Sequence, residues 1–168
     1  NNAGITADAQ LLKMTETDFD RVIDVNLKGV FNCTQATAAV MVEQGYGKIV
    51  SATSVVGLYG NFGQTNYVAA KAGVIQITQT LAAEWGRSGV RVNAVSPGFT
   101  RTAMLEAGIA SGALNRKWLE SPTAMNRLVE PVEVARAIAW LLSPMSSGVT
   151  GINLPVDAGY IAGTTWAA

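Results

Sequence analysis

Three side chains that could act together on an alcohol or a carbonyl group lie close to one another in the sequence. Ser54 follows a short, β-branched segment at 47–53, which favours a buried strand, so Ser54 lies where that strand ends. Tyr67 and Lys71 are four residues apart at the start of a helical pattern, so their side chains share one helix face. A hydroxyl, a phenol and an ammonium group can therefore converge.

These groups suit proton transfer coupled to hydride transfer. An unperturbed tyrosine has a pKa of about 10, and a nearby ammonium favours the phenolate, so we expect Lys71 to lower the pKa of Tyr67. Tyr67 could then donate a proton to a carbonyl oxygen while hydride reaches the carbon, or accept the proton in reverse, and Ser54 could hold the same oxygen. The structural alternative is that Tyr67 and Lys71 merely begin an amphipathic helix with their polar tips in solvent.

Alternating strands and amphipathic helices must position these groups. The residues Thr15 to Asp18 form a capping-box pattern at the start of a long helix. Apolar periodicity predicts helices at 15–42, 66–87 and 131–143, and strands at 48–53, 90–95 and 150–156. This order is typical of an α/β fold with a doubly wound parallel sheet, which we expect to form a single domain over residues 1–168.

Polar turns follow the strands or their expected ends. In doubly wound folds, ligands bind beyond the carboxyl ends of the strands, so the turns at 1–4, 54–64 and 96–102 should meet along one rim. Residues 100–128 are weakly periodic and carry glycines, which predicts short helices in a substrate lid. Its Met104, Leu105, Trp118 and Met125 belong either to the core or to the substrate pocket.

The composition narrows the classes of partner. Lys and Arg total 12, as do Asp and Glu, so no basic excess favours nucleic acid or an anionic membrane, and a small-molecule substrate is expected. The absence of histidine excludes a Ser-His-Asp triad and argues against the common zinc sites, so no metal is expected. The single cysteine, Cys33, is predicted to be a small buried residue, and a reducing cytoplasm is the expected location.

Taken together, these motifs make the chain resemble the later two-thirds of a classical short-chain dehydrogenase/reductase. The matching features, in order, are Asn1-Asn2-Ala3-Gly4, Asn26, Ser54, Tyr67-x-x-x-Lys71, Asn93 and Pro97-Gly98-x-Thr100-x-Thr102. The resemblance implies a partial Rossmann-type fold and an NAD(P)-dependent oxidoreductase that interconverts a secondary alcohol and a ketone.

The resemblance also implies a role for each matched residue. Tyr67 would be the catalytic acid/base, Lys71 would lower its pKa and bind the nicotinamide ribose, Ser54 would orient the substrate oxygen, and Asn26 would hold a water in a proton relay. The residues implied to contact NAD or NADP are Asn2, Ala3, Gly4, Tyr67, Lys71, Pro97, Gly98, Thr100 and Thr102. From physical chemistry alone, a buried Asn26 is more simply explained as a partner for backbone groups at a helix bend, and Asn93 as a tie between backbone elements.

Two features depart from the family pattern. The glycine-rich turn that seats a pyrophosphate, and the residue that selects NAD or NADP, have no counterpart in the 168 residues, so we expect a fragment whose sheet edge needs covering. The alternative function is therefore an inactive remnant or assembly module that self-associates through its long helices, as a dimer or tetramer. The second departure is Ala158 in Asp157-Ala158-Gly159, which would be strained if that position needed a positive φ.

The substrate is less constrained by sequence. The segment around Gly63-Gln64-x-Asn66-Tyr67 is similar both to 3-oxoacyl-thioester reductases and to polyol or sugar dehydrogenases. Because an acidic carrier protein would favour a basic rim, and basic residues are sparse around 43–46 and 86–88, a free small alcohol or ketone is the favoured substrate.

Overall fold

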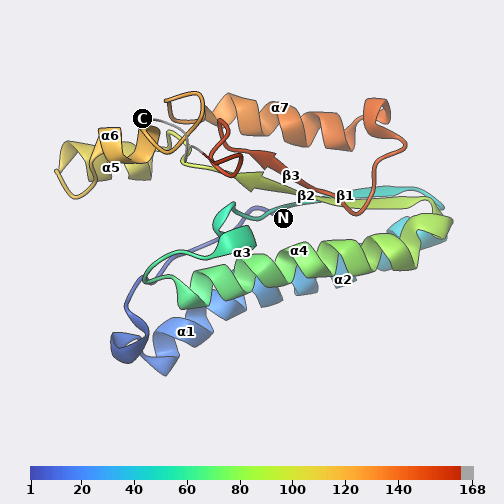
Figure 1. Cartoon of the computed structure of the whole chain (residues 1–168). Coiled ribbons are helices and arrows are strands. Elements are labelled where there is room, and N and C mark those ends of the chain that lie inside the picture. The colour runs from blue at the N-terminus through green and yellow to red at the C-terminus, as the bar shows by residue number, and fades with distance from the viewer. Residues whose placement is uncertain (164–168) are drawn as a thin grey trace.

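A three-stranded parallel sheet forms the centre of the protein. In the computed structural model, which describes residues 1–163, the strands β1 (Gly47–Ala52), β2 (Val90–Pro97) and β3 (Asn153–Val156) lie in the order β1-β2-β3 and all pairs are parallel. In Figure 1 the strands point toward the side of the molecule where α3 (Val56–Tyr59), α5 (Ala103–Ala110) and α6 (Arg116–Glu120) lie. The predicted α/β class and parallel sheet are confirmed.

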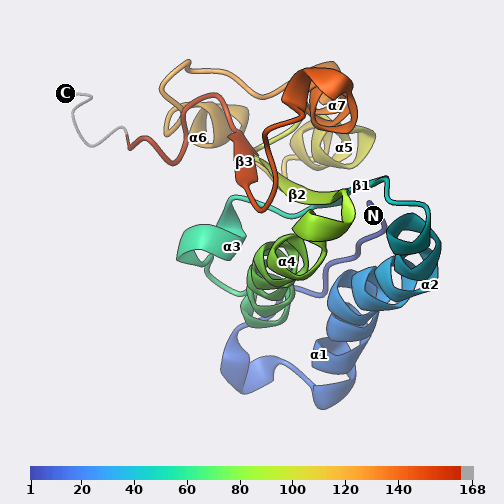
Figure 2. The ribbon, with the colours of Figure 1, turned by 90° about the vertical axis from the view of Figure 1, so that its right-hand side faces the viewer.

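Helices cover both faces of the sheet. Figures 1 and 2 show α2 (Gly29–Glu43) and α4 (Thr65–Trp85) on one face and α7 (Pro131–Leu142) on the other. Successive residues of β1 point to opposite faces of the sheet. Ile49 packs with Val90, Val92 and Ala82 of α4 on one face. Val50 packs with Val95 and with Leu141 of α7 on the other face. This alternation follows from the period of two in a strand and gives the doubly wound arrangement.

The first long helix contains a local irregularity. Thr15 caps α1 (Glu16–Ile23) by accepting a hydrogen bond from Asp18 N, as the capping pattern predicts. A π-helical turn, η2 (Asp24–Lys28), then joins α1 to α2, and Asn26 lies within it, completely buried. A π turn inserts one extra residue into a helix and is frequent at functional sites.

The remaining elements are short. Single 3-10 turns occur at η1 (Leu11–Lys13), η3 (Gly86–Ser88) and η4 (Pro144–Ser146). The side chain of Asn93 donates to Val149 O at 3.0 Å and accepts from Ile152 N at 3.2 Å, so it ties β2 to the segment before β3 as expected. Ala158 has a φ of 53°, so the left-handed conformation anticipated for this position is present.

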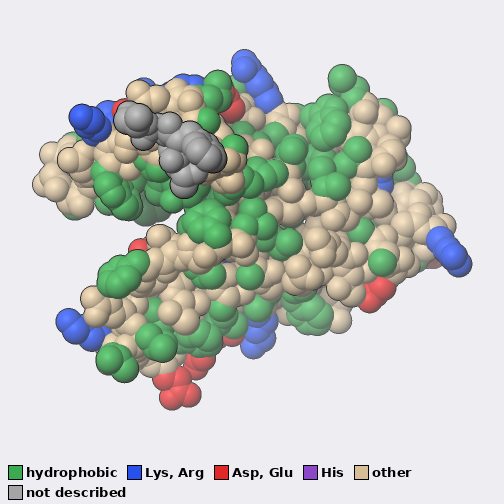
Figure 3. Space-filling view, viewed as in Figure 1, with side chains coloured by type: hydrophobic (Ala, Val, Ile, Leu, Met, Phe, Trp, Pro, Cys, Tyr) green, Lys and Arg blue, Asp and Glu red, His purple; other side chains and the backbone are tan. Residues whose placement is uncertain are grey.

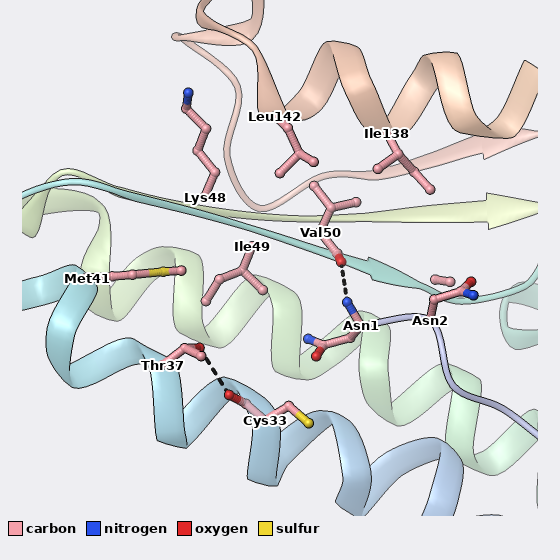
Figure 4. Close-up of a pocket in the computed structure, with 11 residues that line it drawn as sticks. Asn1, Asn2, Cys33, Thr37, Met41, Lys48, Ile49, Val50, Ile138 and Leu142 are labelled. Carbon is pink, nitrogen blue, oxygen red and sulfur yellow. Dashed lines mark hydrogen bonds between the residues drawn. The ribbon is translucent and has the colours of Figure 1, made fainter.

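A groove runs beside β1, on the side away from β2. Figure 4 shows Ile138 and Leu142 of α7 above it and Cys33, Thr37 and Met41 of α2 below it. Asn1 begins to fill this edge, because its backbone nitrogen donates to Val50 O at 3.0 Å and its carbonyl accepts from Ala52 N at 2.8 Å. The groove continues past Asn1 along Lys48 and Ile49.

The prediction that Cys33 is buried was wrong. Its side chain is exposed and lines the groove beside β1, while Val30, Thr34 and Ala38 form the buried face of the same helix. Which side chains of α2 are buried depends on the segments that pack beside each face of the helix. The apolar pattern of α2 alone does not identify these segments. Across residues 1–163, none of the helices has both the length and the apolar character that crossing a bilayer requires.

Candidate active site

Ser54 and Tyr67 line the same small cavity at the carboxyl ends of β1 and β2. The cavity has a volume of about 190 Å³ and is lined by Thr6, Ser54, Val55, Val56, Tyr59, Asn61, Gln64, Tyr67, Gly98 and Phe99. Its walls come from the segment after Asn1, the end of β1, the start of α4 and the turn after β2. The predicted turns at 54–64 and 96–102 therefore meet at this cavity, whereas the third predicted turn, at 1–4, does not line it and Thr6 stands there instead.

The three candidate groups are arranged around the Tyr67 ring. Ser54 and Tyr67 line one cavity, where the Ser54 side chain acts to lower the pKa of the Tyr67 phenol, and Lys71 Nζ lies 5.5 Å from the centre of the Tyr67 ring. Lys71 is only 4% exposed, and its ammonium donates to Ala52 O at 2.8 Å, which anchors it beneath the end of β1. A hydroxyl, a phenol and an ammonium do converge, as their spacing predicted.

The acid–base balance differs from the expectation in one respect. Burial raises the pKa of Tyr67 above its ordinary value, and the Ser54 side chain only partly opposes this effect. The expected lowering by Lys71 is therefore not the dominant influence. Lys71 is itself affected, because burial lowers the pKa of its ammonium. Both shifts have the same cause, since removal from water penalises the charged form of each group.

Asn26 holds the chain that enters the site. Its side-chain oxygen accepts from Ile5 N and its side-chain nitrogen donates to Ile5 O, both at 2.8 Å. Gly4 lies between Asn26 and Lys71, because a β-carbon on Gly4 would stand 3.5 Å from Asn26 Oδ1 and 3.7 Å from Lys71 Nζ. The backbone-tying role expected from physical chemistry is thus confirmed for Asn26.

Two polar residues near Tyr67 also fasten this entering segment, a structural role that the sequence analysis did not assign to them. Asn66, fully buried, donates to Ala7 O at 2.9 Å and to Asp18 O at 3.3 Å. Gln64 donates to Asp8 Oδ2 at 2.9 Å. The only indication of this role in the sequence is that two polar residues directly precede a candidate catalytic tyrosine. Their hydrogen-bond partners lie more than 45 residues away in sequence, so the sequence does not identify them.

The candidate cofactor residues occupy two separate places. Val55 N donates to Pro97 O at 3.2 Å, and Gly98 reaches the cavity. Thr100 and Thr102 lie beyond the cavity lining: the Thr100 hydroxyl donates to Gly98 O, and Thr102 caps α5 by accepting from Leu105 N. Asn2 and Ala3 are exposed at the start of the chain, where Asn2 also borders the groove beside β1.

A set of aromatic rings extends from the cavity, of which the sequence had suggested only Trp118. Tyr59 stacks on Tyr160 with ring centres 5.6 Å apart, and Phe99 meets Tyr160 edge-on at 5.3 Å and Trp118 at 6.3 Å. We call Tyr59, Phe99, Trp118 and Tyr160 the aromatic wall. Figure 3 shows the surface hollowed between the arm that carries α5 and α6 and the arm that carries α1 and the start of α4, with hydrophobic side chains along it.

Known proteins resemble this chain over nearly its whole length. Residues 1–161 match the family described as enoyl-(acyl carrier protein) reductase. The chain is 50% identical over 161 residues to the 3-oxoacyl-(acyl-carrier-protein) reductase FabG of Thermotoga maritima, an alignment that covers 96% of this chain and 64% of that protein. It is 47% identical over 158 residues to the (3R)-3-hydroxyacyl-CoA dehydrogenase of Canis lupus familiaris, covering 94% of this chain and 60% of that protein.

A solved structure agrees with these relatives. The structure of ElxO with NADP bound has a TM-score of 0.93 and 32% sequence identity, and the match covers 96% of this chain and 66% of that one. The chain thus spans less than two-thirds of the length of the two curated relatives.

Proposed function

Because the chain belongs to the classical short-chain dehydrogenase/reductase family, we propose that it carries the catalytic portion of an NAD(P)-dependent oxidoreductase that interconverts a secondary alcohol and a ketone. The observation that carries this proposal is that Ser54 and Tyr67 line one cavity while Lys71 is buried beside the Tyr67 ring. The cavity of about 190 Å³ suits the reacting end of a substrate and leaves the rest to the hollow outside it.

Tyr67 is the acid in the direction of ketone reduction. Its raised pKa keeps the phenol protonated at neutral pH, so it has a proton to donate to the carbonyl oxygen. Ser54, which lines the same cavity as Tyr67, holds the same oxygen within reach of that proton. In alcohol oxidation Tyr67 takes the proton, and the ammonium of Lys71 stabilises the phenolate that accepts it. A bound nicotinamide supplies or accepts the hydride.

The residues around Lys71 fit a nicotinamide nucleotide. Ala52 O takes one of the three N–H donors of the ammonium, which leaves donors for the hydroxyl groups of a ribose. Gly4, without a side chain, keeps the approach to Lys71 open. In this proposal Asn2, Ala3 and Gly4 lie against the adenosine side, and Pro97, Gly98, Thr100 and Thr102 against the nicotinamide side. NAD and NADP both remain candidates, and ElxO, whose structure is similar, binds NADP.

Two further roles complete the proposal. Asn26, held by Ile5, would position a water that relays protons from Lys71, because both side chains lie next to Gly4. Residues 100–128, which include α5 and α6, would close over the substrate. The single cysteine fits a protein that works in a reducing cytoplasm.

A second candidate is an assembly module, which one surface favours. A groove along α2 and α4 is lined by Phe31, Thr34, Gln35, Ala38, Gly73, Gln76, Ile77, Thr80, Leu81, Glu84 and Trp85. Phe31 is 48% exposed there. An apolar groove along two long helices suits the same helix pair of a second copy, so self-association belongs to either candidate.

Nucleotide binding and turnover separate the two candidates. The chain is titrated with NADH and with NADPH by calorimetry, and oxidation of a secondary alcohol is followed through nicotinamide absorbance. The oxidoreductase predicts that Tyr67→Phe lowers turnover by about 100-fold or more while nucleotide affinity is retained, because only the proton transfer is removed. Equal turnover in Tyr67→Phe would contradict the role of Tyr67. Self-association without nucleotide binding would instead favour the assembly module.

A further inference from the structure

The aromatic wall connects the catalytic cavity to the surface. Tyr59 and Phe99 line the cavity together with Ser54 and Tyr67. Tyr160 links them, stacked on Tyr59 at an interplanar angle of 27° and nearly perpendicular to Phe99 at 89°. Trp118 of α6, whose side chain is 65% exposed, continues from Phe99. A substrate whose oxygen lies between Ser54 and Tyr67 therefore extends along these rings.

The rings are unusually accessible for aromatic side chains. Tyr59 is 49% exposed and Trp118 is 65% exposed, although burial of such rings is strongly favourable. Tyr59 and Phe99 line the cavity, and none of the four rings belongs to the core clusters on the two faces of the sheet. Ring faces carry partial negative charge and attract the edges of other rings, so a planar unsaturated group gains more here than a saturated one.

The charges around the lid argue against an anionic substrate. Arg101 pairs with Glu106 and Glu130, Arg116 with Glu106 and Glu120, and Arg127 with Glu133. These guanidinium groups are therefore already neutralised by carboxylates.

We propose that the aromatic wall selects uncharged ketones and alcohols that carry an aromatic ring next to the reacting carbon. This inference rests on the proposed function for the position of the reacting oxygen, and it adds the substrate class. Tyr59 and Phe99 are the specificity-determining residues, since both contact the cavity directly, and Tyr160 holds their relative orientation.

Two ketones with the same carbon skeleton test the proposal without turnover. Acetophenone and cyclohexyl methyl ketone are titrated into the chain, and affinities are measured from backbone amide shifts in NMR spectra. Stacking predicts that acetophenone binds about fivefold more tightly, with the amide signals of Tyr59 and Phe99 among those that shift. Equal affinities of the two ketones would overturn the proposal.

Substitutions in the aromatic wall test whether its rings cause the preference for acetophenone. Tyr59→Leu and Phe99→Leu keep an apolar side chain but remove the ring, and each is expected to reduce the preference to less than about twofold. Phe62→Leu is the matched control, because Phe62 is 81% exposed in the same loop and does not line the cavity, so its preference should equal that of the wild type. Dispersed amide spectra verify folding, and the half-exposed Tyr59 provides a test even if Phe99→Leu fails to fold. Retention of the full preference in Tyr59→Leu would contradict the wall.

The outcome is distinguishable from that of the proposed function. If acetophenone binds more tightly than cyclohexyl methyl ketone but turnover is unchanged in Tyr67→Phe, the proposed role of Tyr67 is wrong and the proposed selectivity of the aromatic wall stands. Turnover of 2-butanone that requires Tyr67, combined with equal binding of the two larger ketones, would retain the oxidoreductase and remove the wall.

Discussion

Asn26 and Ile5 form a closed pair, in which one side-chain amide satisfies both backbone groups of a residue 21 positions earlier, at 2.8 Å in each direction. The pair joins the π-helical turn to the segment that leads from Gly4 into the catalytic cavity. Asn26 has no solvent exposure, so removal of its amide takes away the two partners that the Ile5 backbone groups have in the folded protein.

We therefore expect Asn26→Ala to lower the free energy of unfolding by about 2–4 kcal/mol, the cost of leaving the two Ile5 groups without partners. Urea denaturation followed by circular dichroism measures this change. Asn32→Ala is the control, since Asn32 is exposed on α2 and its replacement should change stability by less than about 0.5 kcal/mol. Equal effects of the two substitutions would show that the Asn26–Ile5 pair does not stabilise the fold.

Ala158→Gly should stabilise the protein. Ala158 adopts a φ of 53°, a left-handed conformation that costs a residue with a β-carbon about 1–2 kcal/mol, partly offset by the greater freedom of glycine in the unfolded chain. The expected gain is about 0.5–1 kcal/mol in thermal or urea unfolding. Ala83→Gly, at an exposed position within α4, should instead lose about 1 kcal/mol. A loss of stability in Ala158→Gly would contradict the assignment of strain.

The pair of Arg127 and Glu133 gives stability a dependence on acid pH. The hydrogen bonds that Arg127 donates to Glu133 lower the pKa of the Glu133 carboxyl from 4.5 to about 2. The unfolded state therefore binds the proton first as pH falls, so the contribution of the pair is complete above pH 4.5 and is lost progressively toward pH 2. In Arg127→Gln the Glu133 carboxyl should titrate nearer 4.5, and the stability–pH curve should be flatter in that window. Side-chain NMR titration of Glu133 in both proteins checks this, and an unchanged midpoint would refute it.

Self-association through α2 and α4 should depend on Phe31. Phe31→Glu introduces a charge into the apolar groove along these helices and is expected to shift the protein to monomers in sedimentation velocity. Val40→Glu is the matched control, because Val40 is 61% exposed on α2 but lies outside the groove, so it should associate as the wild type does. Monomers in the wild type would exclude this interface.

Much of the fold and the centre of the site followed from local patterns. The strand before Ser54 and the helical spacing of Tyr67 and Lys71 place the three groups at one rim, and the structure brings them together. The direction of the Tyr67 pKa shift was not predictable in this way, because it depends on burial by segments distant in sequence. Three rings of the aromatic wall were missed for the same reason: Tyr59 ends the short helix α3, Phe99 and Tyr160 lie in two separate loops, and none of them belongs to a periodic pattern.

The π-helical turn at Asp24–Lys28 also constrains how this segment tolerates changes in length. Removing one residue there would restore regular α-helical geometry, which would ordinarily be favourable. The π turn holds its extra residue locally, so the flanking helices α1 and α2 keep nearly the same register whether or not that residue is present. What the extra residue provides is the position of Asn26, whose amide pairs with both backbone groups of Ile5. We therefore expect a deletion within Asp24–Lys28 to keep the buried faces of the two helices and to displace the Asn26–Ile5 pair, so its effect should resemble that of Asn26→Ala.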